Sequence, residues 1–310
     1  MTTPSQTNSL SRCSSGSSNE FSRIDIVIVN WNSGILLQKC IAALDRSTVA
    51  GKARIVIVDN ASVDGSVDQL SATRLEVVLL RNDTNVGFAA ASNMGAARCD
   101  AEYIVFLNPD VRVRQDTLSR ILEFLNDTSN TAVGVVGIQL VDGDDRIQRT
   151  CARKPTVVAL LLRALFLDRV VPWFVPSHFL IEWDHGDTRQ VDQVMGACLV
   201  VRRAAFLQIG GFDQRYFLYY EDLDLCLTAW STGWKVTYFP GAVAEHTGGG
   251  STGKIKCRRI FYLVCSRLKY TQKWHGSLAA MLLGFFTLFV EIPGRLGVLA
   301  LRQIRSKELP

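Results

Sequence analysis

The residues best suited to chemistry in this chain are short polar side chains that directly follow runs of aliphatic residues. Amide and carboxylate groups can hold a base and a ribose, glycine lets the backbone approach a ligand, and a carboxylate is a hard ligand for Mg²⁺ or Mn²⁺. Asn, Asp and Gly are also common in turns, so any one segment alone could be only a turn. The four segments are Asn30-Trp31-Asn32, Asp59-Asn60, Asn85-Val86-Gly87 and Asn108-Pro109-Asp110.

A second group of candidate residues lies in the later part of the chain. Glu221, Asp222 and Asp224 place three carboxylates within four residues. Such groups repel one another unless they are solvated, metal-bound or raised in pKa, and a raised pKa suits a general base. At a helix start they could instead only complement the helix dipole. His246 precedes the glycines at 248–250, where a ligand role suits it better than it suits an isolated histidine.

The segments that must position these residues alternate between strand-like and helix-like patterns. The aliphatic runs 24–29, 54–58, 75–80 and 103–107 are typical of strands buried on both faces, and segments with helical spacing, such as 35–44 and 88–98, lie between them. This alternation predicts an α/β fold with a mostly parallel central sheet. Ligands of such sheets bind beyond the carboxyl ends of the strands, so the polar segments are expected at one edge.

Composition favours a folded, membrane-seeking protein. Hydrophobic residues make up 48% of the 310 residues and charged residues 20%, which excludes global disorder. The net charge of +5 is uninformative, but between Glu245 and Glu291 every charged residue is basic. This block predicts an anionic partner, such as a lipid surface or phosphate. The eight scattered cysteines are expected as buried thiols, without disulfides or a zinc site.

Three regions are expected along the chain. Residues 1–22 read as a disordered tail without a secretory signal. Residues 23–250 form the catalytic domain, with a nucleotide-binding half, 23–150, and an acceptor or catalytic half, 151–250, in which 154–187 is expected as a mobile or acceptor-facing insertion. Basic and apolar membrane-associating helices follow in 251–310.

The uncharged run 278–290 is a candidate membrane contact. A spanning helix needs roughly 20 apolar residues, and Glu291, Pro293 and Arg295 cut this run short. We therefore expect a helix that lies in the membrane interface. The alternative is a helix packed on the domain or on the partner of a homodimer.

Taken together, the motifs resemble family 2 glycosyltransferases, and within them most closely the bacterial rhamnosyltransferase subgroup. The likeness runs in the family's order from about Ile24 to His275. It implies a GT-A fold, which is a Rossmann-like central sheet flanked by helices, a nucleoside-diphosphate sugar as donor and a divalent metal, Mg²⁺ or Mn²⁺. The motifs are Val29-Asn30-Trp31-Asn32, Val58-Asp59-Asn60-Ala61-Ser62, Asn85-Val86-Gly87-Phe88-Ala89, Leu107-Asn108-Pro109-Asp110 and Tyr220-Glu221-Asp222-Leu223-Asp224-Leu225.

The resemblance also implies a role for each matching position. Asp110 would bind the metal with His246 as second ligand, although Asn108 stands where the family's Asp-X-Asp motif has its first carboxylate. Asp222 aligns with the catalytic base, and Glu221 precedes it. The donor would be held by Asn30, Asn32, Asp59, Asn60, Asn85, Gly87, Asn93 and Asn108, and the donor and acceptor pocket would be shaped by Trp31, Gly196, Ala197 and Arg202.

The implied activity is inverting sugar transfer in cell-envelope glycan synthesis. The favoured donor is dTDP-rhamnose, and the acceptor is a glycan, either a polysaccharide or one linked to a polyprenyl lipid. UDP-galactofuranose or a UDP-hexose would use the same motifs, since these bind the diphosphate and the metal. The protein is expected to be peripheral, on the cytoplasmic face of the inner membrane.

The alternative of another class is a non-catalytic domain that binds membrane or nucleic acid through its basic face. Nucleic-acid binding would weaken steeply with salt and would need no metal. Asp110, Asp222 and His246 are all present and favour the enzyme, so no nucleic-acid partner is expected. The chain also lacks the glycine fingerprint of dinucleotide-binding oxidoreductases. The enzyme reading requires Asp110 and Asp222 to face one pocket.

Overall fold

The structure, a computed structural model, describes residues 23–70, 73–169, 177–248 and 256–298. The predicted tail 1–22 and the end of the chain, 299–310, lie outside the described residues, and so do Gly249, Gly250 and Lys254.

Strands and helices alternate through the first half of the chain, as the sequence predicts. The strands are β1 Ile24–Asn30, β2 Ala53–Asp59, β3 Glu76–Arg81, β4 Tyr103–Leu107, β5 Val111–Val113, β6 Val133–Val141, β7 Ile147–Gln148, β8 Cys151–Ala152, β9 Arg189–Gln190, β10 Gln193–Val194, β11 Cys198–Arg202 and β12 Lys235–His246. The α-helices are α1 Ile35–Asp45, α2 Phe88–Ala96, α3 Thr117–Asn126, α4 Val157–Ala164, α5 Arg203–Ile209, α6 Glu221–Ser231, α7 Lys256–His275 and α8 Ser277–Phe286. Short 3-10 turns lie at Ala50–Lys52, Thr128–Asn130 and Leu167–Arg169, and a π-helical turn at Thr287–Glu291.

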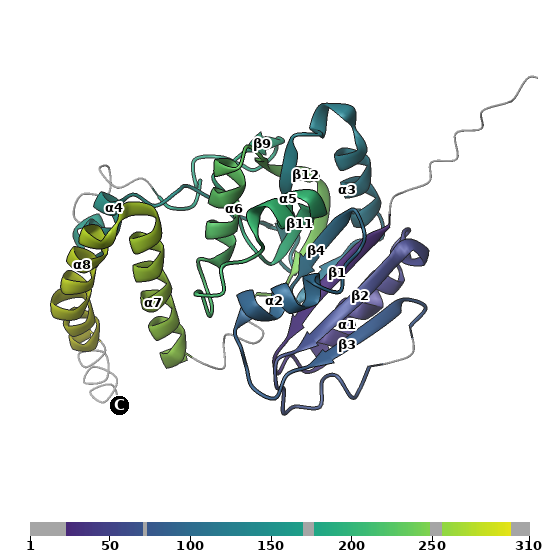
Figure 1. Ribbon diagram of the computed structural model, residues 1–310, viewed down its shortest axis with the longest axis horizontal. Helices are drawn as coiled ribbons and strands as arrows, with labels where there is room; N and C mark the ends of the chain where they lie inside the picture. The colour runs from purple at the N-terminus through teal and green to yellow at the C-terminus, as the bar shows by residue number, and fades with distance from the viewer. Residues whose placement is uncertain (1–22, 71–72, 170–176, 249–255, 299–310) are drawn as a thin grey trace, which may run out of the picture.

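One mixed sheet forms the centre of the molecule (Figure 1), with the strand order β3-β2-β1-β4-β11-β6-β12-β5. The pairs β3–β2, β2–β1, β1–β4 and β6–β12 are parallel, whereas β11 runs antiparallel to both of its neighbours. The antiparallel pairing of β12 with β5 places His246 beside Val111, the residue after Asp110. Positions far apart in sequence therefore meet at one end of the sheet.

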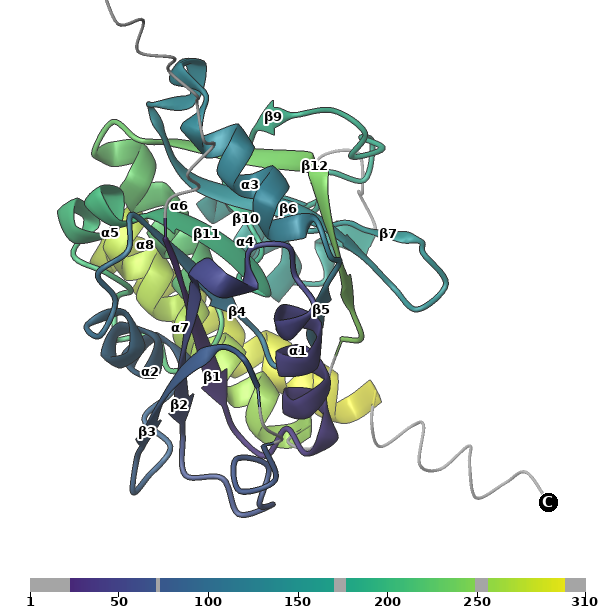
Figure 2. The same ribbon diagram turned by 90° about the vertical axis from the view of Figure 1, so that its right-hand side faces the viewer.

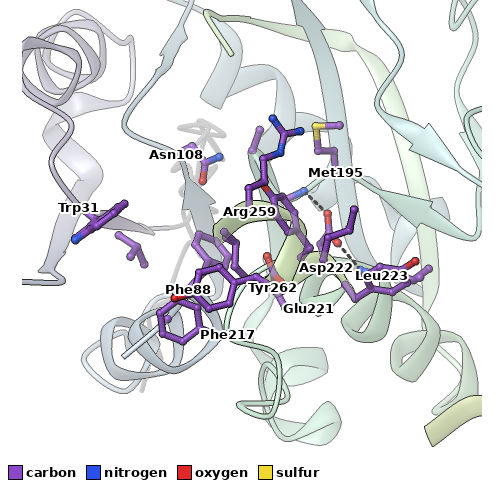
Figure 3. Close-up of a pocket in the computed structure, with 18 of the residues that line it drawn as sticks. Trp31, Phe88, Asn108, Met195, Phe217, Glu221, Asp222, Leu223, Arg259 and Tyr262 are labelled. Carbon is purple, nitrogen blue, oxygen red and sulfur yellow. Dashed lines mark hydrogen bonds between the residues drawn. The ribbon is translucent and has the colours of Figure 1, made fainter. Parts of the chain in front are cut away.

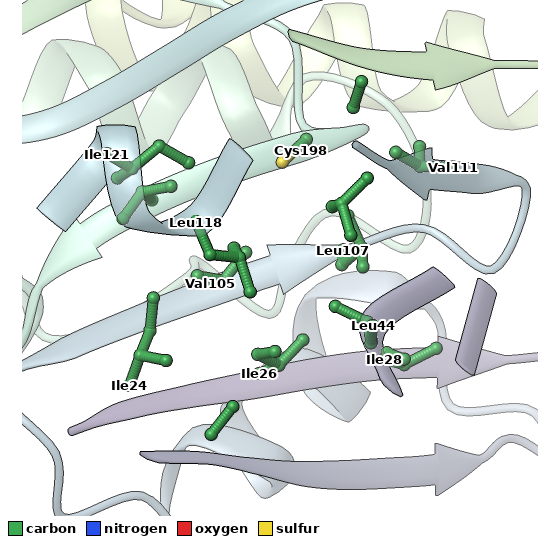
Figure 4. Packing of buried hydrophobic residues seen from close by; sticks show 14 of the residues in the cluster. Ile24, Ile26, Ile28, Leu44, Val105, Leu107, Val111, Leu118, Ile121 and Cys198 are labelled. Carbon is green, nitrogen blue, oxygen red and sulfur yellow. The ribbon is translucent and has the colours of Figure 1, made fainter. Parts of the chain in front are cut away.

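Alternating side chains of the parallel strands fill two cores, one on each face. Ile24, Ile26 and Ile28 pack under α1 and α3, which cover the face seen in Figure 2, and Figure 4 shows this layer. Val27 points the other way, into the core beneath α2, α5 and α6. Burial on both faces explains why these strands read as nearly continuous aliphatic runs. The predicted GT-A-type α/β fold is confirmed.

A smaller third core joins the C-terminal helices to the rest of the molecule. Leu160 of α4, Leu223 of α6, Tyr270 of α7 and Leu283 of α8 are buried together there. Figure 1 shows α7 and α8 as an antiparallel pair beside α6, on the side away from the sheet. The insertion predicted at 154–187 contributes α4 to this core, and residues 170–176 lie outside the described chain.

The apolar C-terminal helix is longer than predicted. It runs from Ser277 to Val298 and is long and apolar enough to cross a membrane by length and composition, with a mean hydropathy of 1.7. Glu291 does not end it, because its carboxylate is buried against Arg267 and Arg295. Pro293 lacks an amide hydrogen and cannot donate the usual helical hydrogen bond. The π-helical turn, which ends two residues earlier at Glu291, accommodates the proline within the helix.

Candidate active site

A cavity of about 920 Å³ opens at the carboxyl ends of the parallel strands. Trp31 follows β1, Asn60 follows β2 and Asn108 follows β4, and all three line it. Asp110 and Asp222 line the same cavity, so the two carboxylates face one pocket as required. Figure 3 shows Asp222 and Asn108 among its side chains.

Behind this wall, three of the predicted donor-binding residues form a support, in which Asn30 and Asp59 are buried and Asn32 is half-buried. The Nδ2 atom of Asn30 donates to Asp59 Oδ1 over 2.8 Å and to the hydroxyls of Ser62 and Ser66. Asn32 Oδ1 accepts a hydrogen bond from the amide of Val63. Asn30, Asn32 and Asp59 do not line the cavity, and they instead fix the loop after β2. Their contact with a nucleotide stays a prediction.

The next layer holds the loop between β3 and α2 against the cavity. Asn60 Nδ2 donates to Asn85 Oδ1 over 2.9 Å, and Asn60 Oδ1 accepts from the amide of Val86. Gly87 has a φ of 87° and lies so close to Phe217 that an added Cβ would be 2.6 Å from the Phe217 carbonyl oxygen. Glycine is thus required here for backbone conformation and close packing. Asn60, Asn85 and Gly87 all line the cavity.

Two further predicted site residues, Asn93 and Arg202, lie outside this cavity. Asn93 of α2 binds both backbone groups of Phe212, donating to its oxygen and accepting from its amide, so it joins α2 to the loop after α5. Arg202 ends β11, which runs antiparallel to β4, so it lies beside Tyr103 at the amino end of β4. Its guanidinium binds Glu102 and the carbonyl of Leu125. The prediction that Arg202 borders the pocket is wrong, because the reversal of β11 carries it to the opposite sheet edge.

Asp110 and His246, the two predicted metal ligands, lie close together. His246 Nε2 lies 3.7 Å from Asp110 Oδ1, which is too long for a hydrogen bond. Gln148 of β7 donates from Nε2 to the carbonyl oxygen of His246 and turns its Oε1 to His246 Nδ1 at 2.8 Å. The Nδ1 atom must then carry the proton, which leaves the Nε2 lone pair on the side of Asp110. Burial lowers the pKa of His246 and favours this neutral form.

This pair fits a divalent cation that also binds a substrate diphosphate. A histidine ligand is commonly oriented by a partner on its other ring nitrogen, as Gln148 does here. Mg²⁺ is usually held by one or two carboxylates together with phosphates and water. Among the described residues no group of three or more His, Cys, Asp or Glu side chains could hold a metal by itself. The site would therefore depend on the substrate's phosphates to complete the coordination.

Asp222 is positioned by the start of α6 and by the segment before β11. Its Oδ2 accepts from the amide of Gly196 over 2.9 Å, and its Oδ1 accepts from Gln193 Nε2 and from the amide of Leu223. Burial raises the pKa of Asp222, and these hydrogen bonds oppose the rise. An added Cβ on Gly196 would be 3.3 Å from Asp222, so glycine allows this close approach.

The neighbouring Glu221 has a buried carboxyl group with an unusually high pKa. Burial, with the nearby charge of Asp222, raises the pKa of Glu221 to about 8. Its Oε2 has no hydrogen-bond partner in the described chain, and the residue lines the cavity. Tyr219 and Tyr220 precede it with φ values of 69° and 70°. A left-handed conformation in two such residues is strained, and strain of this kind is often held at functional sites.

Several cavity residues could not be recognised from the sequence. Gln193 of β10 reaches Asp222 only through the fold, because it lies in the segment before β11. The same segment brings Ala197, which the motifs did predict, to the cavity, where its carbonyl accepts from the amide of Asn108. Further additions come from the insertion and from α7, whose basic residues are visible in the sequence but whose place in the site is not. They include His178, Phe179, Arg258, Arg259, Tyr262 and Leu263.

The fold is of the GT-A class, a central mixed sheet flanked by helices, and the cavity lies at the carboxyl ends of its parallel strands. The structure of a mannosyltransferase from Pyrobaculum calidifontis in complex with GDP-mannose and Mn²⁺ superposes with a TM-score of 0.54, at 18% identity over 93% of this chain and 76% of that one. The profile of Glycosyl transferase family 2 matches residues 25–206, and the chain belongs to this family. Membership supports an inverting hexosyltransferase and confirms the resemblance stated from the motifs.

The relatives point to one subgroup. The N-acetylglucosaminyl-diphospho-decaprenol L-rhamnosyltransferase of Mycobacterium tuberculosis is 29% identical over 74% of this chain and 78% of its own length. The rhamnosyltransferase WbbL of Escherichia coli is also 29% identical, over 47% of this chain and 53% of its own. The chain is therefore a family 2 glycosyltransferase with rhamnosyltransferase relatives in cell-envelope glycan synthesis.

Proposed function

We propose that this protein transfers L-rhamnose from dTDP-rhamnose to a lipid-linked glycan acceptor, with inversion at the anomeric carbon. The observation that carries the proposal is the shared cavity, in which Asp110 and His246 meet the ends of the parallel strands and Asp222 lies with them. A cation pair for a diphosphate and a general base for a hydroxyl are the two parts that such a transfer needs.

The reaction follows from these positions. The acceptor hydroxyl oxygen forms a bond to the anomeric carbon while the bond from that carbon to the diphosphate oxygen breaks. Asp222 takes the hydroxyl proton, and the bonding electron pair leaves with the diphosphate. A metal bound by Asp110 and His246 would neutralise the charge on the leaving oxygens. Since attack and departure occur on opposite faces, the configuration inverts.

The environment of Asp222 suits this role. Hydrogen bonds from Gly196, Leu223 and Gln193 fix both carboxylate oxygens, so the base is oriented before substrate binds. Burial raises its pKa, which makes the ionised form a better proton acceptor than an exposed aspartate. Metal dependence is supported by the histidine tautomer that Gln148 fixes and by the Mn²⁺ present in the mannosyltransferase complex.

The acceptor and location are proposed from the C-terminal helices and from the relatives. The named substrate of the mycobacterial relative is a diphospho-decaprenol lipid. In this chain, α7 joins the cavity wall to a largely exposed apolar helix. This arrangement suits a substrate that stays in the membrane, with the catalytic domain on its cytoplasmic side, where nucleotide sugars are available.

The proposal is tested by a screen of nucleotide sugars with the purified full chain. We expect hydrolysis or transfer with dTDP-rhamnose in Mn²⁺ or Mg²⁺, and loss of activity in EDTA that added metal restores. UDP-galactofuranose and UDP-glucose are the contrasting donors. Faster turnover of either would replace rhamnose as the sugar, and metal-independent turnover would reject the role of Asp110 and His246.

A further inference from the structure

Arg258 and Arg259, on the first turn of α7, give the active-site cavity a cationic edge. The acidic side chains described on its wall are those of Asp110, Glu221 and Asp222. Within the described part of the chain, neither arginine forms an ion pair with a carboxylate, and Arg259 lies over the ring of Tyr219 at 5.8 Å. Figure 3 shows Arg259 and Tyr262 among the side chains around the cavity.

The residues that follow the arginines on α7 are apolar and face outward. Ile260 is 46% exposed and Phe261 64% exposed. Leu263 is also exposed, and it lines the cavity, so the apolar surface of α7 reaches the active site without interruption. Exposed apolar side chains continue on the helix that follows, at Phe285 and Phe289. A cationic edge thus adjoins an apolar surface at the cavity.

We propose that Arg258 and Arg259 bind the diphosphate of a polyprenyl-diphosphate acceptor, whose hydrocarbon chain leaves the cavity over Ile260 and Phe261. Guanidinium groups bind phosphate oxygens with paired hydrogen bonds, and two of them match the charge of a diphosphate. The sugar beyond the diphosphate then lies inside the cavity, where Asp222 can reach its hydroxyl. This inference rests on the proposed function and adds the residues that select the acceptor.

The donor diphosphate has a separate source of positive charge. It is expected at the metal pair of Asp110 and His246, at the strand ends. A water-soluble donor gains nothing from apolar residues beside its phosphates, whereas the phosphates of a lipid lie next to hydrocarbon. The position of Arg258 and Arg259 directly before Ile260 and Phe261 therefore favours the lipid substrate.

A binding experiment tests the inference without requiring turnover. The full chain in mild detergent is titrated with farnesyl diphosphate and, in parallel, with farnesol, with intrinsic tryptophan fluorescence as the readout. Wild-type protein should bind farnesyl diphosphate more tightly. In the double variant Arg258→Gln/Arg259→Gln we expect this preference to fall by about tenfold or more, since hydrogen bonds to charged groups are among the stronger ones in proteins.

Lys269→Gln is the matched control, because it removes a positive charge from an exposed position of α7 outside the cavity. It should retain the preference for farnesyl diphosphate. Binding of dTDP and UDP with Mn²⁺ is measured for all three proteins and should be unchanged, which also shows that the variants are folded. Unaltered farnesyl diphosphate binding in the double variant would overturn the inference. An equal loss of nucleotide affinity would also overturn it, by assigning the arginines to the donor.

Transfer assays separate this inference from the proposed function. With the lipid-diphosphate acceptor, the double variant should raise the acceptor KM and leave the donor KM unchanged. With an alkyl glycoside of the same sugar that lacks the diphosphate, wild type and variant should have the same acceptor KM. If wild-type protein transfers no sugar to either acceptor while the arginine-dependent diphosphate binding holds, the proposed function fails and the binding site stands.

Discussion

At the scale of single residues, the site depends on the different hydrogen bonding of Asp222 and Glu221 and on the orientation of His246. Asp222 accepts three hydrogen bonds, whereas Glu221 beside it has a buried oxygen without a partner. The two adjacent carboxyls therefore differ in their environment. Asp222 is oriented by its hydrogen bonds, as its proposed role as a base requires, and burial favours the protonated form of Glu221.

Substitution of the base gives the most direct prediction. For Asp222→Asn we expect transfer to fall by about 10²-fold or more, the order attributed to general base catalysis. The amide keeps the shape of the carboxylate, so binding of the donor nucleotide should be retained. Steady-state kinetics together with nucleotide titration measure both quantities. Near-normal turnover would assign the base to another residue.

The pKa of Glu221 predicts a pH dependence of stability in the donor-free protein. Its folded value of about 8 exceeds its ordinary value of 4.5, so the folded state holds a proton that the unfolded state releases. This contribution to stability is complete below pH 4.5 and is lost as the pH rises to about 8. Relative to Glu221→Gln, the wild type should lose stability over this range in urea unfolding. A constant difference between the two proteins would show that Glu221 is ionised in the folded state.

Gln148 offers a test of the metal site that leaves both ligands in place. For Gln148→Leu we expect Mn²⁺ affinity, measured with nucleotide present, to fall by about 10- to 100-fold, as is typical when a partner of a metal-binding histidine is lost. Leucine cannot accept a hydrogen bond from the Nδ1–H group of His246, so the tautomer of this histidine is no longer fixed. The substitution Gln190→Leu, in the exposed strand β9, is the control.

At the scale of elements, the sequence predicted well the first strands and helices of residues 23–150, the predicted nucleotide-binding half. The four aliphatic runs became β1 to β4, of which β1, β2 and β4 are buried on both faces and the edge strand β3 is half-buried, and the hydrophobic pattern of a strand reports this burial. The direction of β11 could not be read in this way, since an aliphatic run looks the same in either orientation. Arg202 was therefore assigned to the wrong sheet edge. Gln193, Arg258 and Arg259 reach the cavity only through tertiary packing.

Asn93 is predicted to bind the donor, but in the structure its side chain binds the protein backbone. Its side chain holds both backbone groups of Phe212, and Phe212 packs on Phe88 and Phe106. For Asn93→Ala we expect a loss of about 1–3 kcal/mol in the free energy of unfolding, because two partly buried backbone groups lose their partner. Denaturant unfolding measures this loss. A variant of unchanged stability with weakened donor binding would return Asn93 to the site.

At the scale of the whole molecule, the C-terminal helices give the protein two faces of different chemistry. The 22-residue helix from Ser277 is mostly exposed, and Phe285, Phe289 and Leu288 lie on its outer side. The cavity borders the same pair of helices. Tyr262 of α7 lines it and stacks on Phe217, which also lines it, with their ring centroids 4.5 Å apart. The proposed membrane attachment through this helix and access to the cavity would therefore be properties of one structural unit.

Charges placed on the outer side of this helix should release the protein from membranes. For Phe285→Glu/Phe289→Glu we expect binding to vesicles with anionic lipid to weaken by about tenfold or more, since burial of each phenyl group is worth roughly 1.5–3 kcal/mol. Co-sedimentation with vesicles measures the change. Leu207→Glu, at an exposed position of α5, is the control and should bind as the wild type does. If the double variant bound the vesicles as tightly as the wild type, the outer side of this helix would not be the membrane contact.

Asp224 of α6 is held by two side chains from the end of α7, and this contact has a practical consequence for anyone who shortens this enzyme. Lys273 Nζ and Trp274 Nε1, near the end of α7, bind the two oxygens of this carboxylate over 2.7 and 2.8 Å, and the group is almost fully buried two residues after the base. Cutting the chain before α7 to obtain a soluble fragment would strand that charge in the interior without its cation. Detergent or a lipid disc around the intact polypeptide is the better route to a working preparation.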